Sequence, residues 1–328
     1  MPFVHYNSIY NHKNQKSIKN FIEDNPRYTE AKFVAQHKYD GSNFQIIFEI
    51  DRDLNQNEVN VSFGSRNFKL ESDENFNNHR ELVKKETIAR MINNIKDFLL
   101  KSNKIKSINL FGEIYGKVIR RINYYAPGEK EENKLVFFDV LFDSNYQSCR
   151  FFSEWAQEMS VPVVETFFKG SLDECLALRV EEYKSAGGDV IEGIVIKPFD
   201  HVLDRLDHFY VKKKLEGFEE IVVPKKNQST PYETQLKKKK FSNLNCSDEK
   251  KTHLQLFENY LNSNRVKSVL SKKAWTKQDT KQIANELLID ALKDFNIDNE
   301  TLDLDLPLIT KAFNAQAFAL IKQEDLFK

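Results

Sequence analysis

The sequence predicts an α+β protein, with largely antiparallel sheets and flanking helices first and a small all-helical C-terminal part after them. Two observations lead to this prediction. Segments that alternate apolar and polar residues dominate up to residue 214, and helical periodicity replaces them after residue 246. At 328 residues, with 40% apolar and 30% charged residues, the chain is long enough to bury one large core and a smaller one.

The change of pattern sets the expected domain organisation: a first domain over 1–223, a basic linker over 224–245 and a helical C-terminal domain over 246–328. The linker has almost no apolar periodicity and contains four consecutive lysines at 237–240. Such a run fits a solvated tether and a contact for nucleic-acid phosphates equally well.

Charge and cysteine content limit the possible classes of protein. The formal net charge is zero, so any argument for nucleic-acid binding must rest on local patches. Cys149, Cys175 and Cys246 lie far apart without metal-ligand spacing, which predicts a reducing compartment and no structural zinc. The first residues show no signal-peptide pattern and no segment is apolar enough to span a membrane. We therefore expect a soluble, unsecreted protein, cytoplasmic or in another reducing intracellular compartment.

The expected strands cover residues 33–37, 44–50, 59–63, 108–114, 135–142, 190–197 and 209–214. Residues 44–50 alternate strictly, whereas 108–114 and 135–142 carry apolar residues on both faces, which indicates strands inside a sheet.

The expected helices cover 17–23, ended near Pro26, then 78–100 as one helix or a pair, 153–159 and 172–185. In the C-terminal part, helical spacing recurs over 254–261, 283–295 and 309–321, and Asp279 is placed to cap the middle helix. Residues 1–32 otherwise give no indication of their role.

The segment 34–44 is central to the functional prediction, because Lys38 lies between two apolar runs in the sequence Lys-Tyr-Asp-Gly. A hairpin turn is the simpler interpretation, since Asp-Gly favours the positive φ values of two-residue turns. A nucleophilic lysine is the alternative. At a pKa near roughly 10.4, deprotonation at neutral pH costs roughly 4.6 kcal/mol, so such a lysine needs neighbouring positive charge.

The strand at 209–214 can supply that charge. Its alternation places Lys212 and Lys214 on one face and Lys213 on the other. Two cations on one face can hold a triphosphate and lower the pKa of Lys38. A charged edge strand that blocks aggregation is the alternative.

Further candidates lie at the ends of apolar strands. In 191–198, Glu192 and Lys197 bracket an apolar run, and a bulge or bend at Gly193 is needed if both line one site. Glu113 ends another apolar strand, and with Glu192 it is a candidate for a ribose hydroxyl or magnesium. Phe138 offers a ring for base stacking, although a core position is the alternative.

Together, residues 38–41, 111–113, 137–139, 192–197 and 211–214 resemble motifs I, III, IIIa, IV and V of the covalent nucleotidyltransferases. Within that superfamily the sequence is most similar to the RNA ligase 2 family of bacteriophages and the related kinetoplastid RNA-editing ligases. Arg66, Asn43 and a C-terminal stretch over 261–272 support this branch. Asp40 departs from it, because the phage enzyme has histidine there.

The resemblance implies a nucleotidyltransferase (ATP-grasp-like) fold and an ATP-dependent ligase that uses Mg²⁺ or Mn²⁺. Lys38 would attack the α-phosphate of ATP to form lysyl-AMP, AMP would pass to a 5′-phosphate end, and a 3′-hydroxyl would displace it. Lys197, Lys212 and Lys214 would neutralise phosphate charge, and Phe138 would stack on adenine. Roles toward AMP, ribose or metal would fall to four residues: Asn43, Arg66, Glu113 and Glu192.

The implied partner is nicked duplex RNA with RNA on the 3′-hydroxyl side, bound by a monomer. A DNA ligase or an mRNA capping guanylyltransferase is the alternative among enzymes, although both typically carry an OB-fold where this chain has a helical pattern. An inactive RNA-binding module is the alternative from another class.

Overall fold

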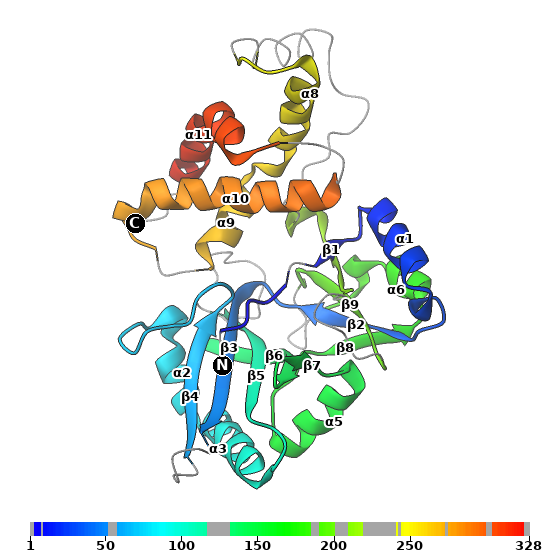
Figure 1. Cartoon of the computed structure of the whole chain (residues 1–328), viewed down its shortest axis with the longest axis vertical. Coiled ribbons are helices and arrows are strands. Elements are labelled where there is room, and N and C mark those ends of the chain that lie inside the picture. The colour runs from blue at the N-terminus through cyan, green and yellow to red at the C-terminus, as the bar shows by residue number, and fades with distance from the viewer. Residues whose placement is uncertain are drawn as a thin grey trace. The chain divides into compact units, whose positions relative to one another are not determined.

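The computed structural model describes residues 3–7, 9–51, 58–116, 132–184, 190–200, 209–218, 241, 244–272, 275–299 and 304–324 (Figure 1). It consists of two compact units, Met1–Leu215 and Glu216–Lys328. The lysine run at 237–240 and most of the linker predicted over 224–245 lie outside the described residues.

The first unit contains two five-stranded sheets. One sheet, called sheet A here, has the order β1-β10-β9-β2-β8, and all its neighbours are antiparallel except β1 and β10. Its strands are β1 (Tyr10–Asn11), β2 (Phe33–Lys38), β8 (Thr166–Gly170), β9 (Gly193–Pro198) and β10 (Val211–Lys214).

The other sheet, called sheet B here, is antiparallel throughout and has the order β4-β3-β5-β6-β7. Its strands are β3 (Gly41–Asp51), β4 (Glu58–Ser65), β5 (Ser107–Gly116), β6 (Asn133–Phe142) and β7 (Asn145–Tyr146). The interior positions of β5 and β6 confirm the prediction from their apolar residues.

Helices cover one face of sheet B. The alternating side chains Phe44, Ile46 and Phe48 of β3 are completely buried, in one core with Met91 and Ile95. Met91 and Ile95 belong to α3 (Glu86–Lys101), which follows α2 (His79–Lys84), and α5 (Cys149–Met159) contributes to the same core. The segment 78–100 is therefore a pair of helices, and Figure 1 shows α2 and α3 beside β3 and β4.

The hairpin interpretation of residues 34–44 is wrong. Strand β2 belongs to sheet A and β3 to sheet B, so the chain leaves one sheet after Lys38 and enters the other at Gly41. The glycine serves a close approach, because a Cβ atom there would lie 2.3 Å from the carbonyl oxygen of Ile114. The only described glycine with positive φ is Gly116.

Two helix predictions need correction. The helix expected over 172–185 is shorter: α6 (Leu172–Ala177) ends early, and a 3₁₀ turn at Val180–Glu182 follows. Asp279 does lie at the start of α10 (Thr280–Asp298), but its carboxylate accepts the backbone N–H of Thr276 at 2.8 Å instead of capping α10. The first helix, α1 (Gln15–Asp24), ends before Pro26 as expected.

The described part of the second unit is helical, as predicted. It comprises α8 (Asp248–Phe257), α9 (Ser263–Leu270), α10 and α11 (Leu306–Gln323). Apolar side chains such as Leu254, Val266, Leu287 and Phe313 are completely buried in one core. In the described ranges of the chain, no helix is long and apolar enough to cross a membrane.

Candidate active site

Four lysines lie on one face of sheet A. Directly opposed residues of neighbouring strands point to the same face, and so do residues four apart on one strand. Lys38 is opposite Gly193, which is opposite Lys214, and Lys197 lies four residues after Gly193. Lys212 lies on the Lys214 side of β10, so the structure brings together all the lysines that the sequence singled out for phosphate chemistry.

Glu192 joins two of these lysines. One carboxylate oxygen lies 2.7 Å from Lys38 Nζ and the other 2.7 Å from Lys214 Nζ. Only 5% of Glu192 is exposed. Burial acts to raise the pKa of Glu192, but the charges of Lys214 and Lys38 and their hydrogen bonds outweigh it and hold that pKa below its ordinary value. Glu192 is therefore a carboxylate at neutral pH.

The backbone around Gly193 explains how this arrangement forms. Glu192 lies in a bend just before β9, and β9 then pairs with β2 and β10 without a shift of register. The predicted bulge or bend is thus a bend. A Cβ atom at Gly193 would lie 2.3 Å from the carbonyl oxygen of Lys213, so only glycine lets β9 approach β10 this closely and bring Glu192 to Lys214.

Lys197 lies deeper and has a different partner. Its ammonium group donates to Asp139 Oδ1 at 2.9 Å and to the carbonyl oxygen of Phe138 at 2.7 Å. Both residues belong to β6, so this ion pair joins sheet A to sheet B. The register of β5 and β6 shifts at this point, because Phe111 is opposite Asp139 while Gly112 is opposite Phe137. Phe138 is the extra residue of this bulge, and its ring centroid lies 5.4 Å from Lys197 Nζ.

Sheet B carries the remaining predicted residues. Asn43 of β3 is directly opposite Glu113 of β5, and Arg66 follows the last residue of β4. Burial raises the pKa of Glu113 to about 8. The negative charges of Glu192 and Asp40 raise this pKa further, whereas the positive charge of Lys38 and, less strongly, that of Arg66 lower it. Tyr115, two residues from Glu113 on β5, contacts the ring of Tyr39 next to Lys38, so this part of sheet B lies beside the end of β2.

The side chain of Asn43 leaves a hydrogen-bond acceptor open in this region. Asn43 Oδ1 is buried, and no described residue donates a hydrogen bond to it. Buried polar groups normally have partners, so an acceptor left open beside a predicted nucleotide site is suited to a donor from a ligand.

Aromatic rings hold the turn that follows Lys38. The ring of Tyr39 stacks on His37 with centroids 3.8 Å apart and contacts Tyr115 at 4.5 Å. Burial lowers the pKa of His37 to about 4, despite the nearby charge of Glu192, so the imidazole is neutral at pH 7. Tyr39 and Phe138 both pack against a small apolar cluster of Tyr115, Val136 and Val164.

The carboxylates of this region fit a divalent cation held mainly by substrate. Mg²⁺ usually takes one or two carboxylates together with phosphate oxygens and water. Glu192 is one such group near the four lysines, and Glu113, which is protonated at pH 7, offers a second when a bound cation displaces its proton. Among the residues that the structure describes, no group of three or more histidine, cysteine, aspartate or glutamate side chains forms a metal site by itself.

Sequence reasoning assigned no role to three residues of this region. Asp139 belongs to the motif at 137–139, and the signal for its role is that a charged residue inside an apolar strand needs a buried partner. Tyr210, directly before the lysine strand, donates to Asp139 Oδ1 at 2.9 Å. Tyr6 donates to Asp139 Oδ2 at 2.5 Å, and no pattern in the sequence predicts this contact.

Comparison with known families agrees with this geometry. A family model described as RNA ligase matches residues 31–215, more than half of the chain. The chain belongs to the RNA ligase family. A second model, described as T4 RNA ligase 2 C-terminal, matches residues 244–317 and confirms the resemblance to the RNA ligase 2 branch. The predicted α+β fold with a helical C-terminal region is confirmed by the two sheets and the helices that follow them.

Solved structures similar to this chain include three of the Naegleria gruberi RNA ligase. The first is the apo form of a point mutant, with 17% sequence identity and a TM-score of 0.45. The second is another point mutant with AMP and Mn, with 18% identity and a TM-score of 0.46. The third is the enzyme with PPi, with 16% identity and a TM-score of 0.44. Each match covers 66% of this chain and 57% or 58% of the Naegleria chain. No curated protein matches this chain.

Proposed function

We propose that this RNA ligase is ATP-dependent and joins RNA 3′-hydroxyl and 5′-phosphate ends at nicks in duplex RNA through a lysyl-AMP intermediate. The observation that carries the proposal is the pairing of Lys38 and Lys214 across the single carboxylate of Glu192, on a face that also holds Lys197 and Lys212. A nucleoside triphosphate needs such a concentration of cations.

The exposure of the lysines supports Lys38 as the nucleophile over Lys197 and Lys214. The side chain of Lys38 is 21% exposed, whereas those of Lys197 and Lys214 are 2% and 5% exposed. A substrate can therefore reach the Lys38 nitrogen, while the other two lysines are fixed charges behind it. Binding of a triphosphate would draw Glu192 and the neighbouring cations into new contacts and free the Lys38 amine.

The first step would form lysyl-AMP. The deprotonated Lys38 Nζ attacks the α-phosphorus of ATP, a phosphorus–nitrogen bond forms, and the bond to the pyrophosphate oxygen breaks. Lys197, Lys212 and Lys214 neutralise the charge on the phosphate oxygens. Phe138 stacks on the adenine ring.

Two further transfers complete the reaction. An oxygen of the RNA 5′-phosphate attacks the AMP phosphorus and Lys38 leaves. The 3′-hydroxyl then attacks the 5′-phosphorus and AMP leaves. Asn43 and Arg66 would contact AMP or the incoming phosphate, and the open acceptor on Asn43 suits this role. Glu113 and Glu192 would hold the ribose hydroxyls or Mg²⁺, or Mn²⁺, and the bound metal would neutralise phosphate charge.

The remaining parts of the proposal concern RNA. The helical C-terminal unit and the linker would clasp the duplex, with the 3′-hydroxyl strand recognised by its 2′-hydroxyls and A-form shape. We propose that the protein acts as a monomer.

Intact mass of the protein after incubation with ATP and Mg²⁺ tests the first step. We expect a gain of one AMP in the wild type and no gain in Lys38→Ala. The matched control is Lys38→Arg, which keeps a positive charge beside Glu192 but cannot supply a neutral amine; it should also remain unmodified. An AMP adduct on Lys38→Ala would show that another residue is the nucleophile, and an unmodified wild type would favour the inactive RNA-binding module.

Nick preference is tested by offering 5′-phosphate nicks in RNA–RNA, RNA–DNA and DNA–DNA duplexes to the adenylylated protein. We expect joining only where the 3′-hydroxyl strand is RNA. Joining of the DNA–DNA nick at a similar rate would favour the DNA ligase alternative.

A further inference from the structure

The N-terminal segment crosses the two sheets at the site, although it precedes the part of the chain that matches the family model. The carbonyl oxygen of Val4 accepts from Gln45 Nε2 at 3.1 Å, and the carbonyl oxygen of Asn7 accepts from Arg66 Nη2 at 3.5 Å. Between these two anchors to sheet B lies Tyr6. Its side chain reaches Asp139, the residue that joins β6 to Lys197 of sheet A.

Asp139 accepts three donors in a buried position, with only 4% of the residue exposed. Oδ1 accepts from Lys197 Nζ and from the hydroxyl of Tyr210, both at 2.9 Å. Oδ2 accepts from the hydroxyl of Tyr6 at 2.5 Å. Because one Asp139 oxygen is held by Tyr6 and the other is shared by Tyr210 and Lys197, the orientation of the carboxylate is fixed from both sides.

Both phenols keep their protons and so act as donors. Burial is the largest cause that raises the pKa of Tyr6 and of Tyr210 well above the ordinary value, and the negative charge of Asp139 raises both further. A protonated phenol beside a carboxylate is a charge-assisted donor, which is about twice as strong as a neutral pair.

The ring of Tyr6 supports a second element of the site. Its centroid lies 5.2 Å from that of Phe138 in an edge contact and 5.2 Å from that of Phe111. One residue of the N-terminal segment therefore contacts both the base-stacking candidate and the anchor of a phosphate-binding candidate.

We propose that Tyr6 is a positioning residue for nucleotide transfer: its hydroxyl holds Asp139 in the orientation that places the Lys197 ammonium, and its ring holds Phe138. This inference rests on the proposed function of Lys197 and Phe138. It gives the N-terminal segment a role in the chemistry of the enzyme in addition to its contribution to the fold.

The effect should appear in the rate at saturating ATP. An ammonium has three N–H donors, and Asp139 and the Phe138 carbonyl use two of those of Lys197 among the described residues, which leaves one for a phosphate oxygen. Without the Tyr6 hydroxyl, Asp139 Oδ2 loses its partner in a buried position and competes for that donor. Small displacements of a positioning group lower transition-state stabilisation more than ground-state binding.

The experiment measures single-turnover formation of lysyl-AMP across a range of ATP concentrations in the full chain, for wild type, Tyr6→Phe, Tyr210→Phe and the double variant. We expect Tyr6→Phe to lower the rate at saturating ATP about tenfold. The ATP concentration at half-maximal rate should change less than about threefold. The double variant should lose less than the product of the two single losses, because both hydroxyls act on one carboxylate.

The matched control is Tyr10→Phe, which removes a hydroxyl from the same part of the chain; the Tyr10 ring packs on Phe21 and Phe209. It should retain the wild-type rate. A Tyr6→Phe rate equal to that of Tyr10→Phe would overturn the proposal, and so would a loss that follows only the unfolded fraction measured by circular dichroism. If the wild type itself forms no adduct, the proposed function fails and the role of Tyr6 fails with it, whereas an active wild type with an equally active Tyr6→Phe overturns the role of Tyr6 alone.

Discussion

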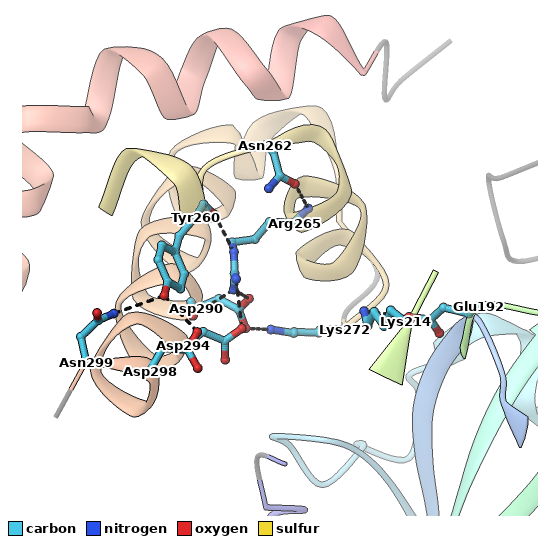
Figure 2. A network of polar contacts seen from close by, with 10 residues as sticks. All are labelled: Glu192, Lys214, Tyr260, Asn262, Arg265, Lys272, Asp290, Asp294, Asp298 and Asn299. Atoms are coloured by element: carbon cyan, nitrogen blue, oxygen red, sulfur yellow. Dashed lines mark hydrogen bonds and ion pairs between the residues drawn. The ribbon is translucent and has the colours of Figure 1, made fainter. Parts of the chain in front are cut away.

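The two units each contain a buried ion network, and the two networks are opposites in charge. In the first unit one acid, Glu192, lies between two bases, Lys38 and Lys214. In the second unit one base, Arg265, lies between two acids, Asp290 and Asp294, at 2.7 Å and 3.0 Å (Figure 2). Both central residues are almost completely buried.

The networks differ in how fully their donors are used. Arg265 also donates to the carbonyl oxygens of Tyr260, at 2.7 Å, and Asp290, at 3.1 Å, and Lys272 pairs with Asp290 as well. Each nitrogen of the guanidinium therefore has a partner within the unit. Lys38, by contrast, is partly exposed and shares its carboxylate with another lysine. A closed ion network fixes a fold, whereas a partly open ion network can exchange partners with a ligand.

The largest expected effect comes from breaking the closed network. Arg265→Leu would leave two carboxylates next to an apolar side chain, and removal of one member of a buried ion network costs about 3–5 kcal/mol. Each unit contains one of the two tryptophans, Trp155 in the first and Trp275 in the second. Urea unfolding in a Trp155→Phe background, followed by fluorescence, therefore reports on the second unit alone.

Lys251→Ala is the matched control for Arg265→Leu. Lys251 pairs with Asp248 at 3.0 Å, but the Asp248 side chain is 97% exposed, so its loss should cost less than about 0.5 kcal/mol. If Arg265→Leu destabilises the second unit no more than this control, the network does not fix the fold.

Breaking the partly open network should affect chemistry more than stability. Glu192→Gln keeps the shape but removes the negative charge. Two effects then oppose each other: Lys38 loses its proton more readily, but Lys38 and Lys214 lose the group that orients them. Orientation has the larger energetic scale, so we expect lysyl-AMP formation to fall about 100-fold, or about 2.7 kcal/mol, in a folded protein.

Single-turnover formation of lysyl-AMP measures the loss in Glu192→Gln, and circular dichroism checks that the variant is folded. The control is Glu182→Gln, an exposed carboxylate paired with Arg179 on the surface. A Glu192→Gln variant with the wild-type rate would contradict the assigned role of Glu192.

The strand pattern predicted the lysine face because it is a local property. Alternation in β10 assigns Lys212 and Lys214 to one face, and no tertiary information is needed. The same reasoning predicted that Glu192 and Lys197 require a backbone irregularity near Gly193. Local signals did not show that β2 and β3 enter different sheets, because Asp-Gly fits a change of sheet as well as a hairpin.

Contacts between the sheets could not be predicted from the pattern. Lys197 pairs with Asp139 of β6, and Asp139 also accepts from Tyr6, which lies far away in the chain. No periodicity in the sequence marks the Lys197–Asp139 or the Tyr6–Asp139 contact. The bulge at Phe138, which makes the Lys197–Asp139 contact possible, depends on the register of β5 and β6. The burial of Arg265 likewise becomes visible only in the tertiary structure, because the sequence singles out the stretch 261–272 only by its resemblance to the family.

Glu113 differs from Glu192 because its carboxyl group is neutral at pH 7. Burial raises the pKa of Glu113 to about 8, so the folded protein binds a proton that the unfolded chain releases above pH 4.5. The stability contribution of this residue should therefore be unaffected below about pH 4.5, fall as the pH rises toward 8, and remain constant above it.

Glu113→Gln should remove this dependence. Relative to wild type, the variant should gain about 1–2 kcal/mol of stability in the first unit between pH 5 and pH 8, an estimate that allows for solvent near a side chain that is only partly buried. Urea unfolding at several pH values, read from Trp155 in a Trp275→Phe background, provides the measurement. A constant difference across this range would show that Glu113 is ionised throughout.

The smallest expected effect separates neighbouring lysines of one strand. Lys213 points to the face opposite Lys212, where its ammonium donates to the carbonyl oxygens of Leu176 and Leu178 at 2.8 Å and 2.6 Å, at the end of α6. A cation there satisfies helix-terminal carbonyls. Lys213→Met should therefore cost about 0.5–1 kcal/mol of stability and leave the rate of lysyl-AMP formation unchanged. Lys212→Met should instead lower the rate of lysyl-AMP formation and leave the stability unchanged. Equal losses of rate in both variants would mean that structural and catalytic lysines do not lie on separate faces of β10.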